Sequence, residues 1–188
     1  MLVKNVVLTV ILLVLIGCSS DKIGDVNEEK MQMHVFDKLW NYNEPAETEH
    51  KFRGVLASTN ALEKPEYQLE LRTQLARTLG LQQKFEDAHA VLDQIEQELT
   101  PAYPVAKIRY LLERGRTHNS SGKKEESLAL FMEAWELGVE VKADFYAVDA
   151  AHMLGIAAKQ DQQLPWNEKA MKLAENSPDK RAQGWLGS

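Results

Sequence analysis

Four sets of positions recur along the chain at an almost constant spacing, and this repetition constrains the fold more than any other feature. The first set holds small residues, a second set follows twelve positions later, and two further sets lie four and seven positions beyond the second. Each set advances by 39 and then by 40 residues. The sets are Ala76, Gly115 and Gly155; Ala88, Ser127 and Asn167; Leu92, Phe131 and Met171; and Ile95, Ala134 and Ala174. One spacing shared by four sets indicates a repeated structural unit.

The pattern within each unit is helical. No stretch alternates apolar and polar residues for long enough to predict a strand, and proline and glycine fall between the apolar segments. We therefore expect an all-α fold. Pro165 is expected in the first turn of its helix, where its missing N–H is not needed. The expected helices span about 28–41, 46–60, 66–80, 84–99, 104–119, 123–137, 143–159 and 165–176, with a short stub at 179–188.

Neighbouring helices are expected to pair into antiparallel hairpins at about 66–99, 105–138 and 144–176. A small residue on each helix lets the two backbones approach closely, and the large residue behind it fills the groove to the next hairpin. A single hairpin leaves an apolar face uncovered, so the hairpins must stack. The sequence therefore predicts an α-solenoid domain over residues 28–188, led by a degenerate hairpin at 28–60.

This pattern resembles the tetratricopeptide repeat (TPR) family. The segment LARTLGLQQKFEDAHAVLDQI has small and large residues where the family has them, including Phe85. The segment RGRTHNSSGKKEESLALFMEA departs from the family at Lys124, where an aromatic residue is usual, and the third repeat departs from it at Asn167. The spacing is also about five residues longer than the usual TPR repeat. The resemblance implies a non-catalytic protein that binds a peptide or protein partner on the concave side of the stack.

The N-terminus has the features of a secretory signal: Lys4, an apolar run from Val6 to Ile16, and the sequence L-I-G-C ending at Cys18. The run is shorter than the roughly 20 residues that span a bilayer. L-I-G-C resembles a bacterial lipobox, which implies removal of signal peptide 1–17, lipidation of Cys18 by chains such as palmitate, and a tether at 18–27. Ser19 implies export to the outer membrane, with the domain on the periplasmic side. The alternative is an ordinary thiol behind an uncleaved helix.

Composition limits the partners. The formal net charge is −6, and removal of residues 1–17 leaves 21 basic against 28 acidic residues. An acidic body argues against nucleic acid as a partner, because phosphate binding needs a basic face. The single cysteine excludes a disulfide within one chain. The histidines outside the repeat surface lack the spacing of metal ligands, so no metal, cofactor or small-molecule substrate is expected.

Projection of the repeat places one set of polar residues on the concave surface of the stack. Arginine binds carboxylates with a planar fork of donors, so this surface is a candidate site for an acidic peptide or a C-terminal carboxylate. The alternative is that each arginine pairs with an acid on its own helix, such as Arg109 with Glu113. The candidate partner-binding residues are Arg77, Arg109, Arg116, Asn119, Asp149 and His152, with Glu70 and Thr73 nearby.

These observations leave three functional hypotheses. The first is a lipid-anchored scaffold or adaptor of the bacterial cell envelope that binds its partner on the concave face. The second is a pilot or assembly subunit of a larger envelope complex, docking through Trp185 and Leu186 at the end of the stack. The third and most remote is a hydrolase, because Asp149 and His152 are three residues apart and share a helix face.

Overall fold

The computed structural model describes residues 34–59 and 65–187. These residues belong to one compact unit, Met33–Ser188, while residues 1–32 form a separate unit. The predictions for the signal peptide 1–17, for Cys18 and for the tether 18–27 therefore concern residues outside the described ranges. Within those ranges, no helix combines the length and the apolar character needed to cross a membrane.

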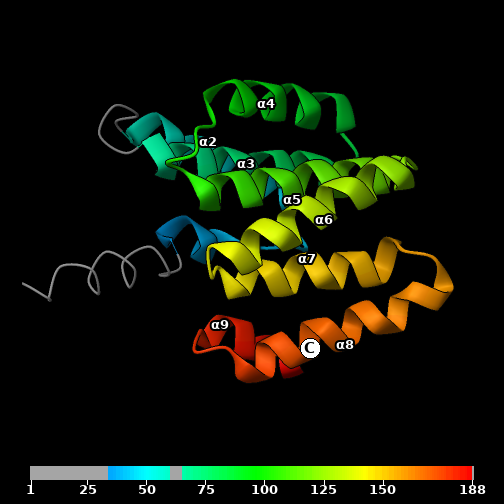
Figure 1. The fold of residues 1–188 in the computed structure, drawn as a ribbon. Helices are drawn as coiled ribbons and strands as arrows, with labels where there is room; N and C mark the ends of the chain where they lie inside the picture. Colours follow the sequence, from blue (N-terminus) through cyan, green and yellow to red (C-terminus); the bar gives the residue numbers. More distant parts are fainter. Residues whose placement is uncertain (1–33, 60–64, 188) are drawn as a thin grey trace, which may run out of the picture. The chain divides into compact units, whose positions relative to one another are not determined.

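The described part of the chain is all-α, with no strand, as the sequence predicted. Helices α3 to α8 alternate with short turns, and 3-10 turns η1 and η2 lie near the two ends (Figure 1). The elements are η1 (Val35–Leu39), α2 (Pro45–Ser58), α3 (Pro65–Leu81), α4 (Phe85–Glu98), α5 (Pro104–Ser120), α6 (Lys124–Glu140), α7 (Asp144–Ala157), α8 (Gln160–Asn176), α9 (Lys180–Gln183) and η2 (Gly184–Gly187).

The helices pack in a helical-repeat-like arrangement. Helix α3 packs on α4, α5 on α6, and α7 on α8. The leading hairpin expected at 28–60 is not a pair of helices in the described residues, where the 3-10 turn η1 precedes α2. Successive pairs contact each other through α3 and α5 and through α6 and α7, while α2 packs on α3. The first helices of the pairs, α3, α5 and α7, therefore line up across the described domain, as the repeat requires.

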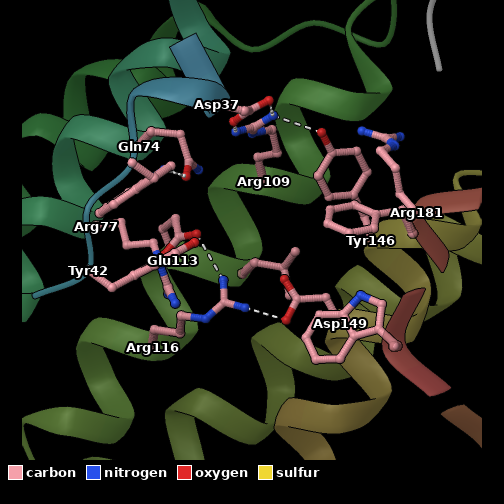
Figure 2. Close-up of a pocket in the computed structure, with 14 residues that line it drawn as sticks. Asp37, Tyr42, Gln74, Arg77, Arg109, Glu113, Arg116, Tyr146, Asp149 and Arg181 are labelled. Atoms are coloured by element: carbon pink, nitrogen blue, oxygen red, sulfur yellow. Dashed lines mark hydrogen bonds and ion pairs between the residues drawn. The ribbon is translucent and has the colours of Figure 1, made fainter. Parts of the chain in front are cut away.

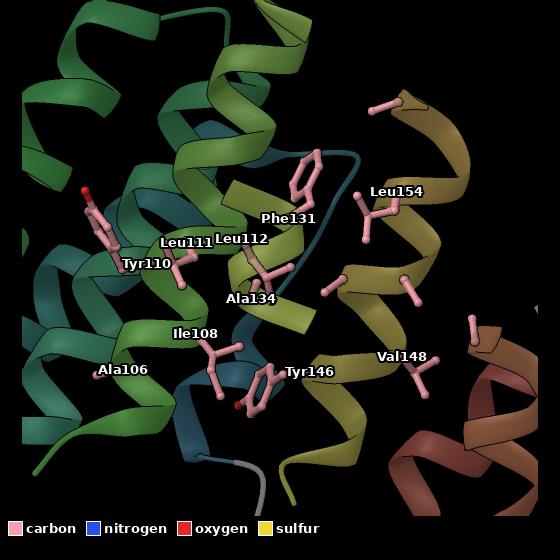
Figure 3. Packing of buried hydrophobic residues seen from close by; sticks show 14 of the residues in the cluster. Ala106, Ile108, Tyr110, Leu111, Leu112, Phe131, Ala134, Tyr146, Val148 and Leu154 are labelled. Carbon is pink, nitrogen blue, oxygen red and sulfur yellow. The ribbon is translucent and has the colours of Figure 1, made fainter. Parts of the chain in front are cut away.

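The repeated small positions lie where helices approach closely. A Cβ atom added to Gly115 on α5 would lie 2.5 Å from Cε1 of Phe131 on α6, so the phenylalanine ring occupies the space of the missing side chain. Gly155 on α7 is covered in the same way by the amide of Asn167 on α8. Figure 3 shows Phe131 and Leu154 among the buried side chains that fill the core between these helices. The packing requires glycine at position 115, because the fully buried Phe131 ring cannot move aside, whereas the Asn167 side chain beside Gly155 is exposed.

One repeated position differs from the prediction. Leu92 and Phe131 are fully buried, but Met171 on α8 has an exposed fraction of 56%. A further hairpin would have to lie against this side of α8 to bury the methionine, and none follows in the described residues. The set three positions later agrees with the prediction, because Ile95, Ala134 and Ala174 are all buried.

Two helix boundaries also differ. Within 28–41, the described part is the 3-10 turn η1 followed by extended Trp40, not an α-helix. The turn is closed by Asp37, whose carboxylate accepts the N–H of His34. Helix α8 begins at Gln160, so Pro165 lies inside the helix rather than in its first turn. Proline has no N–H to donate to the carbonyl of Asp161, four residues earlier. Both residues are exposed, so this carbonyl is not left without a partner in the apolar core.

The C-terminal stub folds back on the last hairpin. Helix α9 packs on α7, and η2 packs on α8. Ala182 is buried, and the Ser177 hydroxyl donates to Asp144 Oδ2 at 2.6 Å. Trp185 turns toward α7, where its ring lies 5.2 Å from the ring of His152, whereas Leu186 is exposed. Of the two residues predicted to dock a partner, only Leu186 faces solvent openly.

The close approach at Gly115 predicts opposite effects of one substitution at two helical glycines. Gly115→Ala should lower the free energy of unfolding by about 1–3 kcal/mol, because the new methyl group collides with the buried Phe131 ring. Gly54→Ala on α2 should raise it by up to about 1 kcal/mol, because nothing lies within 4 Å and alanine favours the helix. Urea denaturation of both variants measures the difference. Equal effects would contradict the packing described here.

Candidate binding groove on the inner face

Residues of α3, α5 and α7 line a groove that the N-terminal segment and the C-terminal stub flank. Its volume is about 260 Å³. Three of the predicted arginines and the predicted Asp149 meet there (Figure 2). We call this site the inner groove. Its lining residues are Asp37, Trp40, Tyr42, Gln74, Arg77, Arg109, Leu112, Glu113, Arg116, Phe145, Tyr146, Asp149, Arg181 and Trp185.

Arg109 lies at the base of the inner groove, with only 4% of its side chain exposed. Its Nη2 donates to Asp37 Oδ1 at 2.6 Å. Its Nη1 donates to the Tyr146 hydroxyl at 2.7 Å and to Glu70 Oε2 at 3.3 Å. Burial by itself lowers the pKa of the guanidinium, but Tyr146, Asp37 and Glu70 outweigh that effect and raise the pKa above its ordinary value. Arg109 is therefore a permanently charged group that joins three elements.

A second chain of ion pairs crosses the groove from α3 to α7. Arg77 Nη1 lies 3.2 Å from Glu113 Oε2, and Arg116 Nη1 lies 2.8 Å from Glu113 Oε1. Arg116 also binds Asp149 on α7. Burial lowers the pKa of Arg116, but Asp149 and Glu113 raise it above its ordinary value overall. Neighbouring first helices are thus joined by charge as well as by apolar packing.

This geometry shows which acids the predicted arginines bind. The expected pair of Arg109 with Glu113 is wrong, because Arg109 binds Asp37 and Glu70 while Glu113 binds the other two arginines. Of the three predicted arginines, only Arg116 pairs with an acid of its own helix, Glu113, among the described residues. The repeat aligns Glu70, Arg109 and Asp149 at equivalent positions of successive helices. Of these aligned charges, Glu70 and Arg109 pair between helices, whereas Asp149 binds Arg116.

Aromatic rings border the inner groove on both sides. On one side Trp40 and Tyr42 stack at 4.6 Å, and the Trp40 indole N–H donates to Gln74 Oε1 at 3.1 Å. On the other side lie Phe145 and Trp185, whose ring centroids are 6.3 Å apart. The sequence did not predict this N-terminal wall, because 28–41 was expected to be a helix, whereas Trp40 is extended after the 3-10 turn η1 and Tyr42 lies in a turn.

Three other groove residues were also missed. Tyr146 stands three positions before Asp149 on the same helix, so the helical period could have placed it on the predicted surface. Asp37 gave no such signal, because it lies 72 residues from the arginine that it binds. Arg181 was left out because the stub was treated only as an end of the stack.

Asn119 and His152 occupy the edges of this region. Asn119 lines a second pocket of about 210 Å³ that shares Arg77, Glu113 and Arg116 with the inner groove. His152 packs against Trp185, and no hydrogen bond joins it to Asp149 among the described residues. The structure therefore brings most of the predicted binding residues together, and the Asp149 carboxylate binds Arg116 rather than His152.

Two further histidines pack together outside the groove. The rings of His89 and His118 lie 4.7 Å apart, and Arg114 Nη1 lies 2.9 Å from His89 Nδ1. Burial lowers the pKa of both imidazoles, as do the neighbouring cations. Within the described ranges, no three histidine, cysteine or acidic side chains are placed to hold a metal ion.

Comparison of the chain with protein families, with curated proteins and with solved structures found no match. The described residues define the class of protein by geometry alone: an all-α chain of stacked helical pairs with a charged, ring-lined groove on its inner face.

The burial of Arg109 predicts a large effect on stability. Arg109→Ala should lower the free energy of unfolding by about 3–5 kcal/mol, because it leaves buried carboxylates without their counter-charge. Arg72→Ala should cost at most about 1 kcal/mol, because its partner Glu98 is solvent-exposed. Thermal and urea unfolding provide the measurement.

A second substitution separates charge from packing at this site. Adding Asp37→Asn to Arg109→Ala should restore part of the lost stability, since it removes one of the uncompensated carboxylates. No recovery in the double variant would mean that Arg109 acts through its packing, for example on the Phe36 ring.

Proposed function

We propose that this protein is a non-catalytic scaffold that binds a peptide or protein partner in the inner groove. One observation carries the proposal: the inner groove and the second pocket adjoin along α5 and share Arg77, Glu113 and Arg116. From Arg109 to Ser120, α5 rises by roughly 17 Å, which matches about five residues of extended peptide. In this proposal the helical pairs form a TPR-like α-solenoid.

Charge exposure supports an anionic partner. In the ion pair of Arg77 and Glu113, 23% of the arginine side chain is exposed but only 5% of the glutamate. In the pair of Arg181 and Asp179 the fractions are 21% and 8%. In these two pairs the acid lies deeper than the guanidinium group, whereas Asp37 is more exposed than its partner Arg109, at 14% against 4%. The positive charge that the groove presents to a ligand therefore comes from Arg77 and Arg181. Solvent-exposed positive charge in the groove is the opposite of the net charge of the whole chain, which is −6.

The proposal includes a membrane tether. Lipidated Cys18 would hold the scaffold at the periplasmic face of the outer membrane, as the lipobox resemblance implies. Stable anchoring takes two lipid signals, and the acyl chains of a lipoprotein meet that requirement. A tether confines the protein to a thin layer, which raises its effective concentration toward partners anchored in the same membrane.

Cys18→Ser tests the tether. The wild-type protein should be found in the membrane fraction, with a mass that lacks residues 1–17 and includes acyl chains. The Cys18→Ser variant should lose the acyl mass, because the lipid is attached at the thiol. Intact-protein mass spectrometry of both forms provides the measurement. A wild-type protein that keeps its first 17 residues and carries no lipid would exclude the tether.

The assembly and hydrolase hypotheses have weaker support. For assembly, exposed Leu186 offers an apolar contact at the end of the stack, but Trp185 packs toward the groove. For hydrolysis, the carboxylate of Asp149 is engaged by Arg116 rather than by His152. Peptide binding uses the groove as it stands, so it remains the preferred function.

The groove hypothesis predicts that Arg77→Ala combined with Asn119→Ala abolishes partner capture. Photocrosslinking in intact cells, from a probe at the exposed Ser120, should trap a partner with the wild-type protein but not with this variant. Arg72→Ala is the matched control, because Arg72 shares α3 with Arg77 but binds Glu98 outside the groove. Glu113 keeps Arg116 as its counter-ion in the double variant, so the fold should survive. Unchanged crosslinking in the variant would remove the groove from the proposed function.

A further inference from the structure

The N-terminal segment shows how the inner face holds a peptide, because residues 37–42 of this chain lie on it. Asp37 binds Arg109, the Trp40 indole donates to Gln74, and the Tyr42 ring lies 5.7 Å from the guanidinium carbon of Arg77. An acid is thus followed three and five positions later by aromatic residues, and all three contact side chains of α3 or α5. This internal segment is an example of the ligand chemistry that the surface accepts.

Further along the groove, the lining again combines arginines with an aromatic ring. Arg116 lies seven residues after Arg109 on α5, about two helical turns further along. Beside it, Arg77 shares Glu113 with Arg116 and is the most exposed arginine of the groove. Trp185 on the far wall corresponds to the rings of the N-terminal wall. The partly exposed guanidinium group of Arg77 and the aromatic ring of Trp185 therefore line the groove next to the internal segment.

We propose that the ligand of this groove is a peptide with an acidic residue followed at three to five positions by aromatic residues, bound beside residues 37–42. Its carboxylate pairs with Arg77, within reach of the Asn119 amide, and its ring packs between exposed Tyr42 and Trp185. This inference rests on the proposed function, which it makes more specific. Arginine suits the acid because it keeps donors for a second carboxylate while it is bound to Glu113.

Basic peptides fit less well. Asp37, Glu113 and Asp149 each bind an arginine, and Glu113 in particular is almost fully buried. A ligand cation would have to displace a guanidinium group from its carboxylate. A ligand carboxylate meets the exposed side of Arg77 and displaces nothing. The ring faces also favour this outcome, since Arg181 already covers Phe145 at 4.6 Å.

Isothermal titration calorimetry with three synthetic peptides tests the inference on the full chain. The first peptide has the sequence of residues 35–42 with glutamine replacing Lys38, which removes its positive charge. The second also has asparagine in place of its aspartate, and the third has alanine in place of both its tryptophan and its tyrosine. The first should bind at least tenfold more tightly than the other two, because each loses one of the two proposed contacts.

Variants of the protein locate the binding. Arg77→Ala should weaken the first peptide at least tenfold, while Arg72→Ala should leave its affinity within twofold. Equal binding of the aspartate and asparagine peptides, or equal effects of the two variants, would overturn the inference. Tighter binding of a single-stranded ten-nucleotide DNA than of the first peptide would also overturn it, in favour of a general anion site.

The peptide titration and the crosslinking experiment can fail independently, so the ligand class and the proposed function are tested separately. If crosslinking in cells depends on Arg77 and Asn119 but the acidic aromatic peptide does not bind, the groove keeps its function and this ligand class is wrong. If the peptide binds through Arg77, both are supported, and the position of its acid and rings defines the motif to seek in partners.

Discussion

The buried guanidinium of Arg109 is the interaction on which the inner face depends. A charge held at 4% exposure is stable only when carboxylates and hydrogen bonds replace its water. Asp37 comes from the N-terminal segment, Glu70 from α3 and Tyr146 from α7, so one side chain on α5 joins all of them. Apolar contacts between stacked hairpins tolerate small shifts, but these directional bonds do not. The network therefore sets the register of three successive elements and the position of the groove walls.

The same residue type has two roles in this protein, and exposure separates them. Arg109 is buried and tied on several sides, which makes it a structural residue. Arg77 reaches solvent and shares its only described carboxylate with Arg116, so it keeps capacity for a ligand. The two interpretations of the arginines from the sequence, internal pairing and peptide binding, are therefore compatible, because they apply to different members of one charged surface.

The repeat was predictable because its cause is local and steric. Gly115 faces Phe131, and Gly155 faces Asn167. Each glycine lies where a larger side chain of the next helix occupies the space that a Cβ atom would need. The small positions recur at a fixed spacing and can be read without coordinates, but the residue that fills the space beside each glycine comes from a different repeated set in the two hairpins. The exposure of Met171 could not be predicted from the repeat. Whether a large residue at a repeated position is buried depends on what lies against it, and the spacing of one helix says nothing about its neighbour.

The sequence alone determined that this chain is all-α and where most of its helices lie, although η1 and the start of α8 differ from the prediction. It also identified the arginines of the inner face. Only the tertiary structure decided which acids those arginines bind, that residues 37–42 form a wall of the groove, and that Trp185 turns inward. The reason is the distance in sequence over which each interaction acts. Helical periodicity and close packing act between residues near in sequence, whereas the partner of Arg109 is 72 residues away and is selected by how the chain folds back on itself.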